Sequence, residues 1–235
     1  VPGDVVDGLT AQREALGIDK IQADYSGPVT IAKKDGAALQ TGGAPSIGSA
    51  YIPPEEQVDT SGLKLVEGRA PQAPGEVAIN TSAAEKGDLT VGTKTRVALG
   101  TGTTPPLDVT VVGLVDMPAA TGGFTNIQFP RDQARELFSS GGYASAVDMS
   151  AVPGVSDTQL RDRVAAQLDQ KDADGEALFK VRTGDQVRED QKAEVATFLN
   201  IFRYILLAFA AIGLLVGTFI IYNTFSMIVA QRNRE

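Results

Sequence analysis

The sequence predicts an α+β protein, with a domain of two small mixed subdomains, one β-rich and one α/β, joined by a helical stalk to a transmembrane helix. Three features predict this. Short alternating runs are separated by Gly and Pro turns, a helical pattern follows them, and an uninterrupted apolar stretch lies near the C-terminus. The expected boundaries are residues 1–184 for the domain, 185–203 for the stalk, 204–230 for the membrane helix and 231–235 for the segment beyond it.

The first part of the domain contains few periodic runs. A short helix is expected around residues 10–16 and a strand at 29–32. Residues 39–49 are rich in Gly, Ser, Thr and Pro, so this stretch is expected to be a loop. Pro53 and Pro54 exclude a central strand directly before them, because proline cannot donate a ladder hydrogen bond.

A β-rich module is expected to follow. Its strand-like runs lie at residues 63–68, 76–79, 95–99 and 107–115. The last two runs alternate at period two and flank a segment rich in Gly, Thr and Pro, which predicts a β-hairpin. Arg69 and Glu76 bracket a Pro-Gly turn and are expected to form a structural pair across it.

An α/β subdomain is expected after this module. Strands are predicted at residues 124–129, 145–149 and 178–182, and helices at 130–138 and 156–170. The second helix has the clearest signals, because Ser156 can cap it and Gln159 completes a capping box. Leu160, Val164 and Leu168 then form the apolar stripe of that helix.

A helical stalk is predicted from Asp185, since no Gly or Pro occurs from there to Gly213. Val195, Phe198, Leu199 and Phe202 follow the spacing of one helix face. The membrane helix is therefore expected to begin about four turns above the bilayer. The alternative is an amphipathic core helix that ends at a kink.

The membrane helix itself is predicted from residues 204–222, which carry no charge. At a rise of about 1.5 Å per residue this stretch is about 28 Å long, close to the hydrocarbon thickness of a bilayer. A buried core helix is disfavoured, because such helices rarely stay apolar on every face for this length. Gly213 and Gly217 form a G-x-x-x-G pair that lets helices approach closely, although this spacing also arises by chance.

The flanks of this stretch carry residues typical of a membrane interface. Tyr204 and Tyr222 lie at its two ends, and Arg203 before it is expected to extend toward the headgroups. Arg232 and Arg234 follow it. Lys and Arg are nearly balanced on the two sides, so charge only slightly favours the long domain lying outside the cytoplasm.

Several phrases of the sequence together resemble one family. They comprise Gly68, Arg69, Pro71, Pro74, Gly75, Glu76 and Val77, then Leu89, Val91 and Gly92, then Val111, Val112 and Gly113, and finally Gln231, Arg232, Arg234 and Glu235. The first three groups, in this order and before an apolar helix, resemble the MacB-type periplasmic core domain. The last group, which follows the apolar helix, resembles the start of an FtsX-like permease domain. Thr93 departs from the family, which usually has Asp there.

The resemblance implies an ABC-transporter permease in the bacterial cell membrane, with residues 1 to about 203 outside the cytoplasm. Val1 would then lie just after a first membrane helix, and the apolar stretch would be the second. The implied partners are a cytoplasmic ABC ATPase subunit, a second permease subunit or half, membrane lipid, and a substrate or envelope protein. ATP hydrolysis would move the membrane helices and, through the stalk, the outer domain. A bitopic sensor and an anchored envelope enzyme are the alternatives.

The composition excludes several kinds of chemistry. The chain has no His and no Cys, which removes Ser-His-Asp and Cys-His catalysis and the usual zinc sites. It carries no Walker motif and has a net charge of −8, so we expect no enzyme activity, no cofactor and no nucleic-acid partner. Glu55 and Glu56, and Asp169, Asp172 and Asp174, are expected to be solvated loop carboxylates, because they lack the spacing of a calcium loop.

Overall fold

The structure is a computed structural model of the 235-residue chain. It describes residues 1–58, 64–100, 102, 104–116, 123–139, 142–171 and 174–232, and within the last range it leaves out the side chains of residues 194 and 229–232. The chain divides into two compact units, Val1–Lys180 and Val181–Glu235, which we describe separately.

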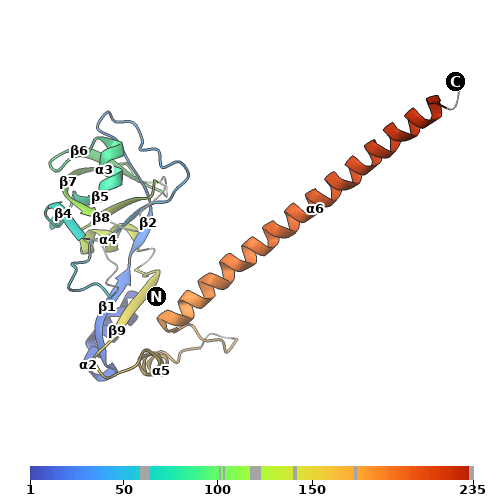
Figure 1. Ribbon diagram of the computed structural model, residues 1–235. Coiled ribbons are helices and arrows are strands. Elements are labelled where there is room, and N and C mark those ends of the chain that lie inside the picture. The colour runs from blue at the N-terminus through green and yellow to red at the C-terminus, as the bar shows by residue number, and fades with distance from the viewer. Residues whose placement is uncertain are drawn as a thin grey trace. The chain divides into compact units, whose positions relative to one another are not determined.

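The first unit is built around a sheet that closes on itself (Figure 1). Its strands are β2 (Ser26–Ile31), β3 (Ser46–Ala50), β4 (Lys64–Gly68), β5 (Glu76–Asn80), β6 (Lys94–Leu99), β7 (Leu107–Asp116) and β8 (Thr125–Phe129). The order is β4-β7-β5-β8-β3-β2-β6, and β6 also pairs with β7. Six strands therefore form a closed barrel, and β4 lies beside it on β7.

The long strand β7 closes the barrel because it has different partners along its length. Thr110 pairs with Lys94 of β6 on one side and with Glu76 of β5 on the other. Beyond Thr110, β4 takes the place of β6 on the same side of β7. The β4–β7 pairing begins where Gly68 lies opposite Gly113. The β5–β7 and β3–β8 pairs are parallel, and the other pairs of the barrel are antiparallel.

Alternate side chains of the barrel strands form one apolar core. Its fully buried members include Ile31, Val77, Ile79, Val97, Val111, Ile127 and Phe129. Helix α3 (Thr81–Gly87) adds Ala83 and Ala84 to this core, and α4 (Arg131–Phe138) adds Ala134. Phe138 of α4 packs edge-on against Phe129, with ring centroids 5.7 Å apart. The two helices thus complete a core that the strands alone would leave open.

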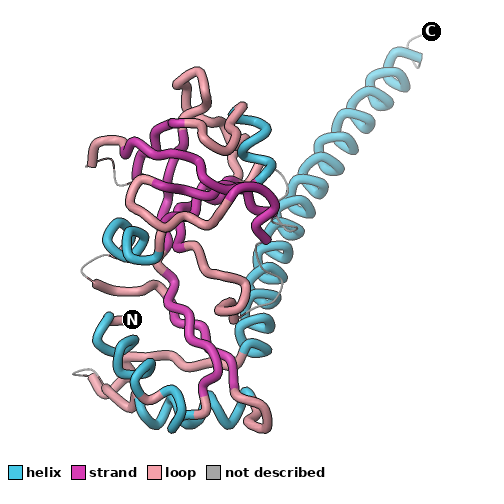
Figure 2. The backbone as a smooth tube through the Cα atoms, turned by 90° about the vertical axis from the view of Figure 1, so that its left-hand side faces the viewer, coloured by secondary structure: helices cyan, strands magenta, loops and turns pink. Residues whose placement is uncertain are grey.

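The rest of the first unit is a two-stranded antiparallel sheet with helices. It contains α1 (Gly3–Ala11), α2 (Arg13–Leu16), β1 (Ile18–Asp24), β9 (Ala146–Ala151) and α5 (Asp157–Gln167). Figure 2 shows the two strands leading from the barrel to these helices. The predicted capping box of α5 is confirmed, since Ser156 and Gln159 exchange hydrogen bonds of 3.0 and 3.2 Å. Leu160 and Val164 are buried, as the apolar stripe predicts.

The second unit is dominated by one unbroken helix, α6 (Gly184–Arg232), of 49 residues. Its most apolar window has a mean hydropathy of 2.5, so α6 is long and apolar enough to cross a membrane. The structure therefore confirms the α+β class and a long apolar C-terminal helix. The division of residues 1–184 into two subdomains remains a prediction.

The structure corrects several predicted elements. Residues 39–49 are not all loop, because β3 begins at Ser46 and pairs in parallel with β8. Residues 178–182 do not form a strand. The predicted helix at 10–16 is instead two helices, α1 and α2, and β1 was not predicted. Residues 63 and 101, which belong to the predicted run and hairpin turn, lie outside the described residues.

The close pairing of β4 with β7 predicts two intolerant glycines. A Cβ on Gly68, where φ is +74°, would lie 2.2 Å from the carbonyl oxygen of Val112, and a Cβ on Gly113 would lie 2.3 Å from that of Arg69. We expect Gly113→Ala to destabilise the protein by about 2 kcal/mol or more, because backbone must move, and to lower its melting temperature by roughly 4–8 °C.

Thermal unfolding of the whole chain in detergent, followed by circular dichroism, measures this effect. Gly8→Ala is the control, because a Cβ on Gly8 of α1 would meet nothing within 4 Å. Alanine also favours a helix by about 1 kcal/mol over glycine, so this variant should melt no earlier than the parent. Equal melting of Gly113→Ala and Gly8→Ala would contradict the prediction.

Candidate functional site

The predicted membrane residues lie along α6. Arg203, Tyr204, Gly213, Gly217 and Tyr222 all belong to this one helix. Both tyrosines are exposed, as are the apolar side chains between them, for example Phe209 and Leu214. Such a helix is apolar on every side, which suits a lipid environment. The interface roles of Arg203 and the tyrosines remain predictions.

Two of the predicted interface residues lie at or beyond the last residue that the structure describes. Arg232 is the last residue of α6, and its side chain is not described. Arg234 lies outside the described residues. The prediction that they lie on the cytoplasmic side therefore rests on the sequence alone.

The two glycines of the G-x-x-x-G pair leave a low surface on α6. A Cβ on either Gly213 or Gly217 would meet nothing within 4 Å. About two turns after Gly217, the Thr224 hydroxyl donates to the carbonyl of Ile220 at 2.8 Å. This hydroxyl is therefore satisfied within its own helix, and the glycine pair is the feature of this face that suits close approach of another helix.

The start of α6 is fixed by interactions that the sequence analysis missed. Thr183 and Gln186 form a reciprocal pair, in which each backbone N–H donates to the other side chain at 3.0 and 3.3 Å. The signal was present as Thr-x-x-Gln at the predicted helix start. Arg182 also donates to Asp190 at 2.7 Å, and Arg188 donates to Asp185 at 2.6 Å.

A polar clamp closes the loop that leads into β5. Arg69 donates through both terminal nitrogens to Glu76, and the N–H groups of Gln72 and Ala73 donate to the same carboxylate at 2.9 and 3.2 Å. The guanidinium and these N–H groups lower the pKa of Glu76 to about 2. The clamp orders the Pro-Gly turn, as the structural pairing of Arg69 and Glu76 predicts.

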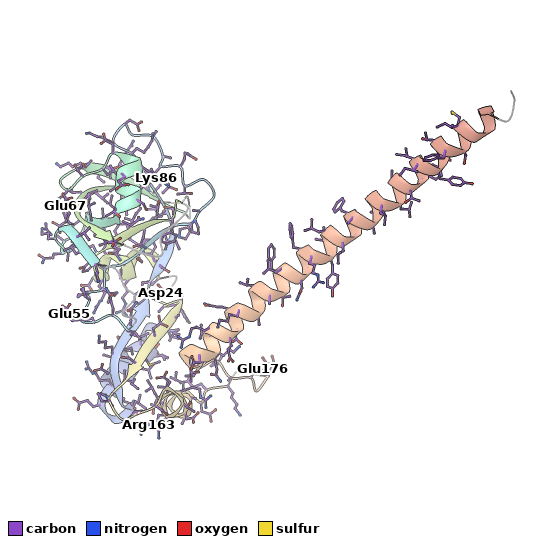
Figure 3. The ribbon with its side chains drawn as sticks, in the orientation of Figure 1. Asp24, Glu55, Glu67, Lys86, Arg163 and Glu176 are labelled. Atoms are coloured by element: carbon purple, nitrogen blue, oxygen red, sulfur yellow. The ribbon has the colours of Figure 1, made fainter. Side chains whose placement is uncertain are left out.

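A junction of polar and aromatic groups joins the two-stranded sheet to the barrel. Asp24, labelled in Figure 3, ends β1, and its carboxylate accepts from Ser26 at 3.2 Å and from Ser145 at 2.9 Å. Tyr25 is buried next to it, with the Arg135 guanidinium 5.9 Å from its ring centroid. These contacts stiffen the segment at residues 24–26, where the chain passes from the two-stranded sheet into the barrel.

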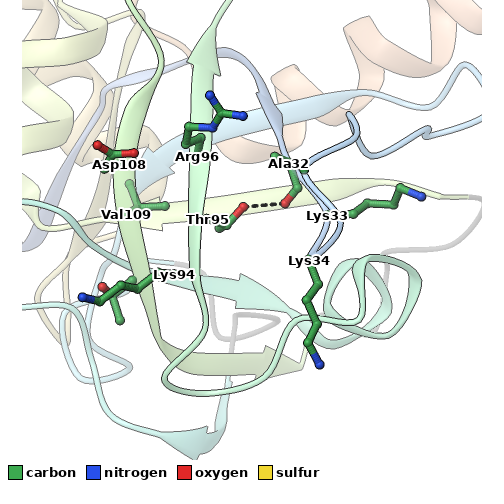
Figure 4. A pocket seen from close by; sticks show the side chains of 10 residues that line it. Ala32, Lys33, Lys34, Lys94, Thr95, Arg96, Asp108 and Val109 are labelled. Carbon is green, nitrogen blue, oxygen red and sulfur yellow. Dashed lines mark hydrogen bonds between the residues drawn. The ribbon is translucent and has the colours of Figure 1, made fainter.

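A hollow beside strands β6 and β7 does not form a convergent site. It has a volume of about 500 Å³ and is lined by Ala32, Lys33, Lys34, Gly36, Lys94, Thr95, Arg96, Asp108, Val109 and Thr110. Figure 4 shows the cationic side chains pointing in different directions. Lys33 pairs with Asp35 and Lys34 with Asp88, each at 3.2 Å. Two of the four cations of the hollow are therefore already ion-paired, and the four side chains do not converge on one point.

The carboxylates considered in the sequence do not assemble into a centre within the described part of the chain. Glu56 forms an ion pair with Arg131 of α4. No group of three or more Asp and Glu side chains that could hold a metal ion occurs among the described residues. Asp172 lies outside those residues.

Comparison with known proteins identifies the fold. No family model and no curated protein matches the chain. The extracellular domain of the noncanonic ABC-type transporter YknZ from Gram-positive bacteria aligns with a TM-score of 0.54 at 14% identity, over 78% of this chain and 89% of that one. The periplasmic region of MacB from Actinobacillus actinomycetemcomitans aligns with a TM-score of 0.54 at 15% identity, over 80% and 81%. The chain therefore has the fold of MacB-like extracytoplasmic domains, as the resemblance implied.

The clamp predicts a pH-dependent contribution to stability. The pKa of Glu76 is about 2 in the folded protein and 4.5 ordinarily. Its contribution should therefore be complete above about pH 4.5 and disappear as the pH falls toward 2. We expect Glu76→Gln to melt below the parent at pH 7, and the difference to vanish at the acid end of that window.

Circular dichroism melts between pH 7 and pH 2 test this prediction. Glu67→Gln is the control, because Glu67 is exposed on β4 (Figure 3) and forms no ion pair in the described part of the chain. A Glu76→Gln difference that stays constant over the whole pH range would show that the ionised carboxylate does not carry the effect.

Proposed function

We propose that this chain is the extracytoplasmic domain and a membrane helix of an ABC-type permease subunit in a bacterial cell membrane. The observation that carries the proposal is the combination of a MacB-like fold with one unbroken helix that is apolar enough to cross a bilayer. The proteins with the similar fold are described as domains of ABC-type transporters or of MacB. Residues 1 to about 203 would lie outside the cytoplasm.

In this proposal the subunit transmits movement rather than performing chemistry. A cytoplasmic ABC ATPase would hydrolyse ATP, and its closure would move the membrane helices of this subunit and of a second permease subunit or half. Helix α6 contains no proline and is continuous through the predicted stalk and span. An unbroken hydrogen-bonded helix resists bending, so displacement at one end is carried along it.

The outer domain would engage a substrate or an envelope protein. Its barrel has a closed apolar core, and the clamp and the junction order the segments around that core. These features support a domain that moves as a body when the helix moves. The surrounding lipid would contact the apolar surface of α6 within the span.

The proposal predicts the topology of the chain. In intact cells that carry the full-length protein, a cysteine at Thr158, which is exposed on α5, should react with a membrane-impermeant maleimide. A cysteine at Asn233 should react only after the membrane is permeabilised. Residues 1–235 contain no native cysteine, so a full-length protein in which any other cysteine is replaced provides the unlabelled background. Labelling of the Asn233→Cys protein but not of the Thr158→Cys protein in intact cells would reverse the proposed orientation.

Transmission through the stalk is tested by breaking its helix. Ala196→Pro removes a backbone hydrogen bond and clashes with the preceding turn, which costs about 3 kcal/mol or more. We expect the assembled transporter to retain ATP hydrolysis but lose most of its transport or partner activation. Ala196→Leu keeps the helix and should be much milder.

Both stalk variants must be compared at equal abundance in the membrane, because a misfolded subunit would imitate uncoupling. Transport at the parental rate by the Ala196→Pro protein would show that the stalk is not a rigid transmitter. A protein that responds to a ligand but never associates with an ATPase would favour the sensor alternative.

A further inference from the structure

The two-stranded sheet and the barrel meet at one end of β1. The chain crosses between them from β1 to β2 and from α4 to β9. The N–H and the hydroxyl of Ser145 both donate to the Asp24 carbonyl at 3.0 Å, so the two crossings come together at this point. The Arg135 guanidinium lies against Tyr25 and close to Gly3 of α1 at the same end. Contacts grouped at one place leave rotation about that place open, because a single point of attachment does not fix a direction.

A second attachment lies farther along β1. Residues 51–57, which we call the strap, leave the barrel directly after β3. The Lys20 ammonium on β1 donates to the Gln57 carbonyl of the strap at 3.0 Å. Lys20 and Asp24 lie on one face of the strand, and the two attachments are therefore about 13 Å apart along it. Figure 3 shows Glu55 of the strap and Asp24 at the level where the barrel gives way to the two-stranded sheet. Two attachments at this separation fix the direction of β1 on the barrel.

The strap is ordered by its own contacts and by the barrel. The Tyr51 N–H donates to the last carbonyl of β8 at 2.8 Å, and the partly buried Ile52 packs on the barrel core. Two prolines follow Ile52 and restrict the backbone. The Gln57 amide then turns back and donates to the Ile52 carbonyl at 2.9 Å, while Glu56 pairs with Arg131 of α4. The strap thus reaches β1 as a preformed loop rather than a loose chain.

The contact at Lys20 lies on the route by which α6 would move the barrel. Along the chain α6 follows α5, and α5 follows β9, so the covalent path from α6 to the barrel runs through the two-stranded sheet. A sheet that swivels at Asp24 would absorb a displacement, whereas a sheet that is also held at Lys20 would pass it on. The charged donor makes the bond from Lys20 stronger than one between neutral groups.

We propose that Lys20 and the strap lock the two-stranded sheet to the barrel, so that the two turn together when α6 moves. Lys20 acts as a positioning residue through the strap. The proposal deepens the proposed function and rests on it for the source of the movement. The lock itself is a property of this chain alone, and it can be measured without a transport assay.

Distances between two spin labels test the lock. In a cysteine-free full-length protein in detergent, labels at Thr158→Cys on α5 and Lys86→Cys on α3 report on the sheet and on the barrel, since both positions are exposed. Double electron–electron resonance should give one narrow distance distribution for the parent. Lys20→Met keeps a long side chain without a donor, and it should widen the distribution about twofold. Lys20→Arg restores a charged donor and should keep the distribution narrow.

Matched variants separate the lock from general loosening. Lys33→Met is the control, because Lys33 pairs with Asp35 in its own turn at 3.2 Å, and its distribution should equal that of the parent. Gln57→Met removes the bond that closes the strap, so it should widen the distribution as Lys20→Met does. The double variant should be no wider than Lys20→Met, since a strap released at one end is already released.

Each other outcome overturns the proposal. An unchanged distribution in the Lys20→Met protein would show that the strap does not restrain the sheet, and a parent as wide as this variant would show that no lock exists. Equal widening by Lys33→Met would indicate general loosening, and additive widening in the double variant would show that Lys20 and Gln57 act separately. Circular dichroism checks the fold of each variant, and Gln57→Met decides if Lys20→Met does not fold. The Thr158 and Asn233 labelling reports separately on topology, so the proposed function can survive any of these results.

Discussion

The close approach of two glycine backbones, Gly68 and Gly113, is the constraint on which the barrel depends. It lets β4 run onto β7 where a side chain on either residue would strike a carbonyl oxygen. Since β4 occupies the far part of β7 there, β6 is confined to the near part, and β5 lies along the other side. One strand thus serves three partners, and its pairing with both β5 and β6 closes the six-stranded barrel.

The elements that the sequence predicted best are those whose signals are local. The β6–β7 hairpin shows period-two alternation around a short turn, and α5 carries both halves of its capping box within four residues. Helix α6 is marked by the absence of Pro, by the absence of Gly from Asp185 to Ile212, and by its apolar stretch. In each case the interactions that define the element lie close together along the chain.

The failure to predict strands β1 and β3 has a common cause, which is pairing with segments distant in the sequence. Strand β3 consists largely of small residues, and Gly48 is required because the Phe138 ring of α4 lies where a Cβ would point, at 2.4 Å. No residue near β3 in the sequence indicates that contact. Strand β1 has mostly half-exposed residues and pairs with β9, so neither an apolar run nor a nearby partner marks it. The buried Asn80, which accepts from the Asn126 N–H at 2.9 Å and donates to the Phe124 carbonyl at 3.0 Å, was missed for the same reason.

The two units differ in how much of their apolar surface they bury, and this difference bears on the proposed function. The barrel buries its core against its own strands and helices. Helix α6 leaves most of its large apolar side chains exposed over the described part of its length. In the proposed permease, lipid would cover the part of α6 that matches the bilayer. A domain with its own core, attached to such a helix, would suit the transmission of movement in that proposal, because the helix can follow its neighbours in the membrane while the domain keeps its shape.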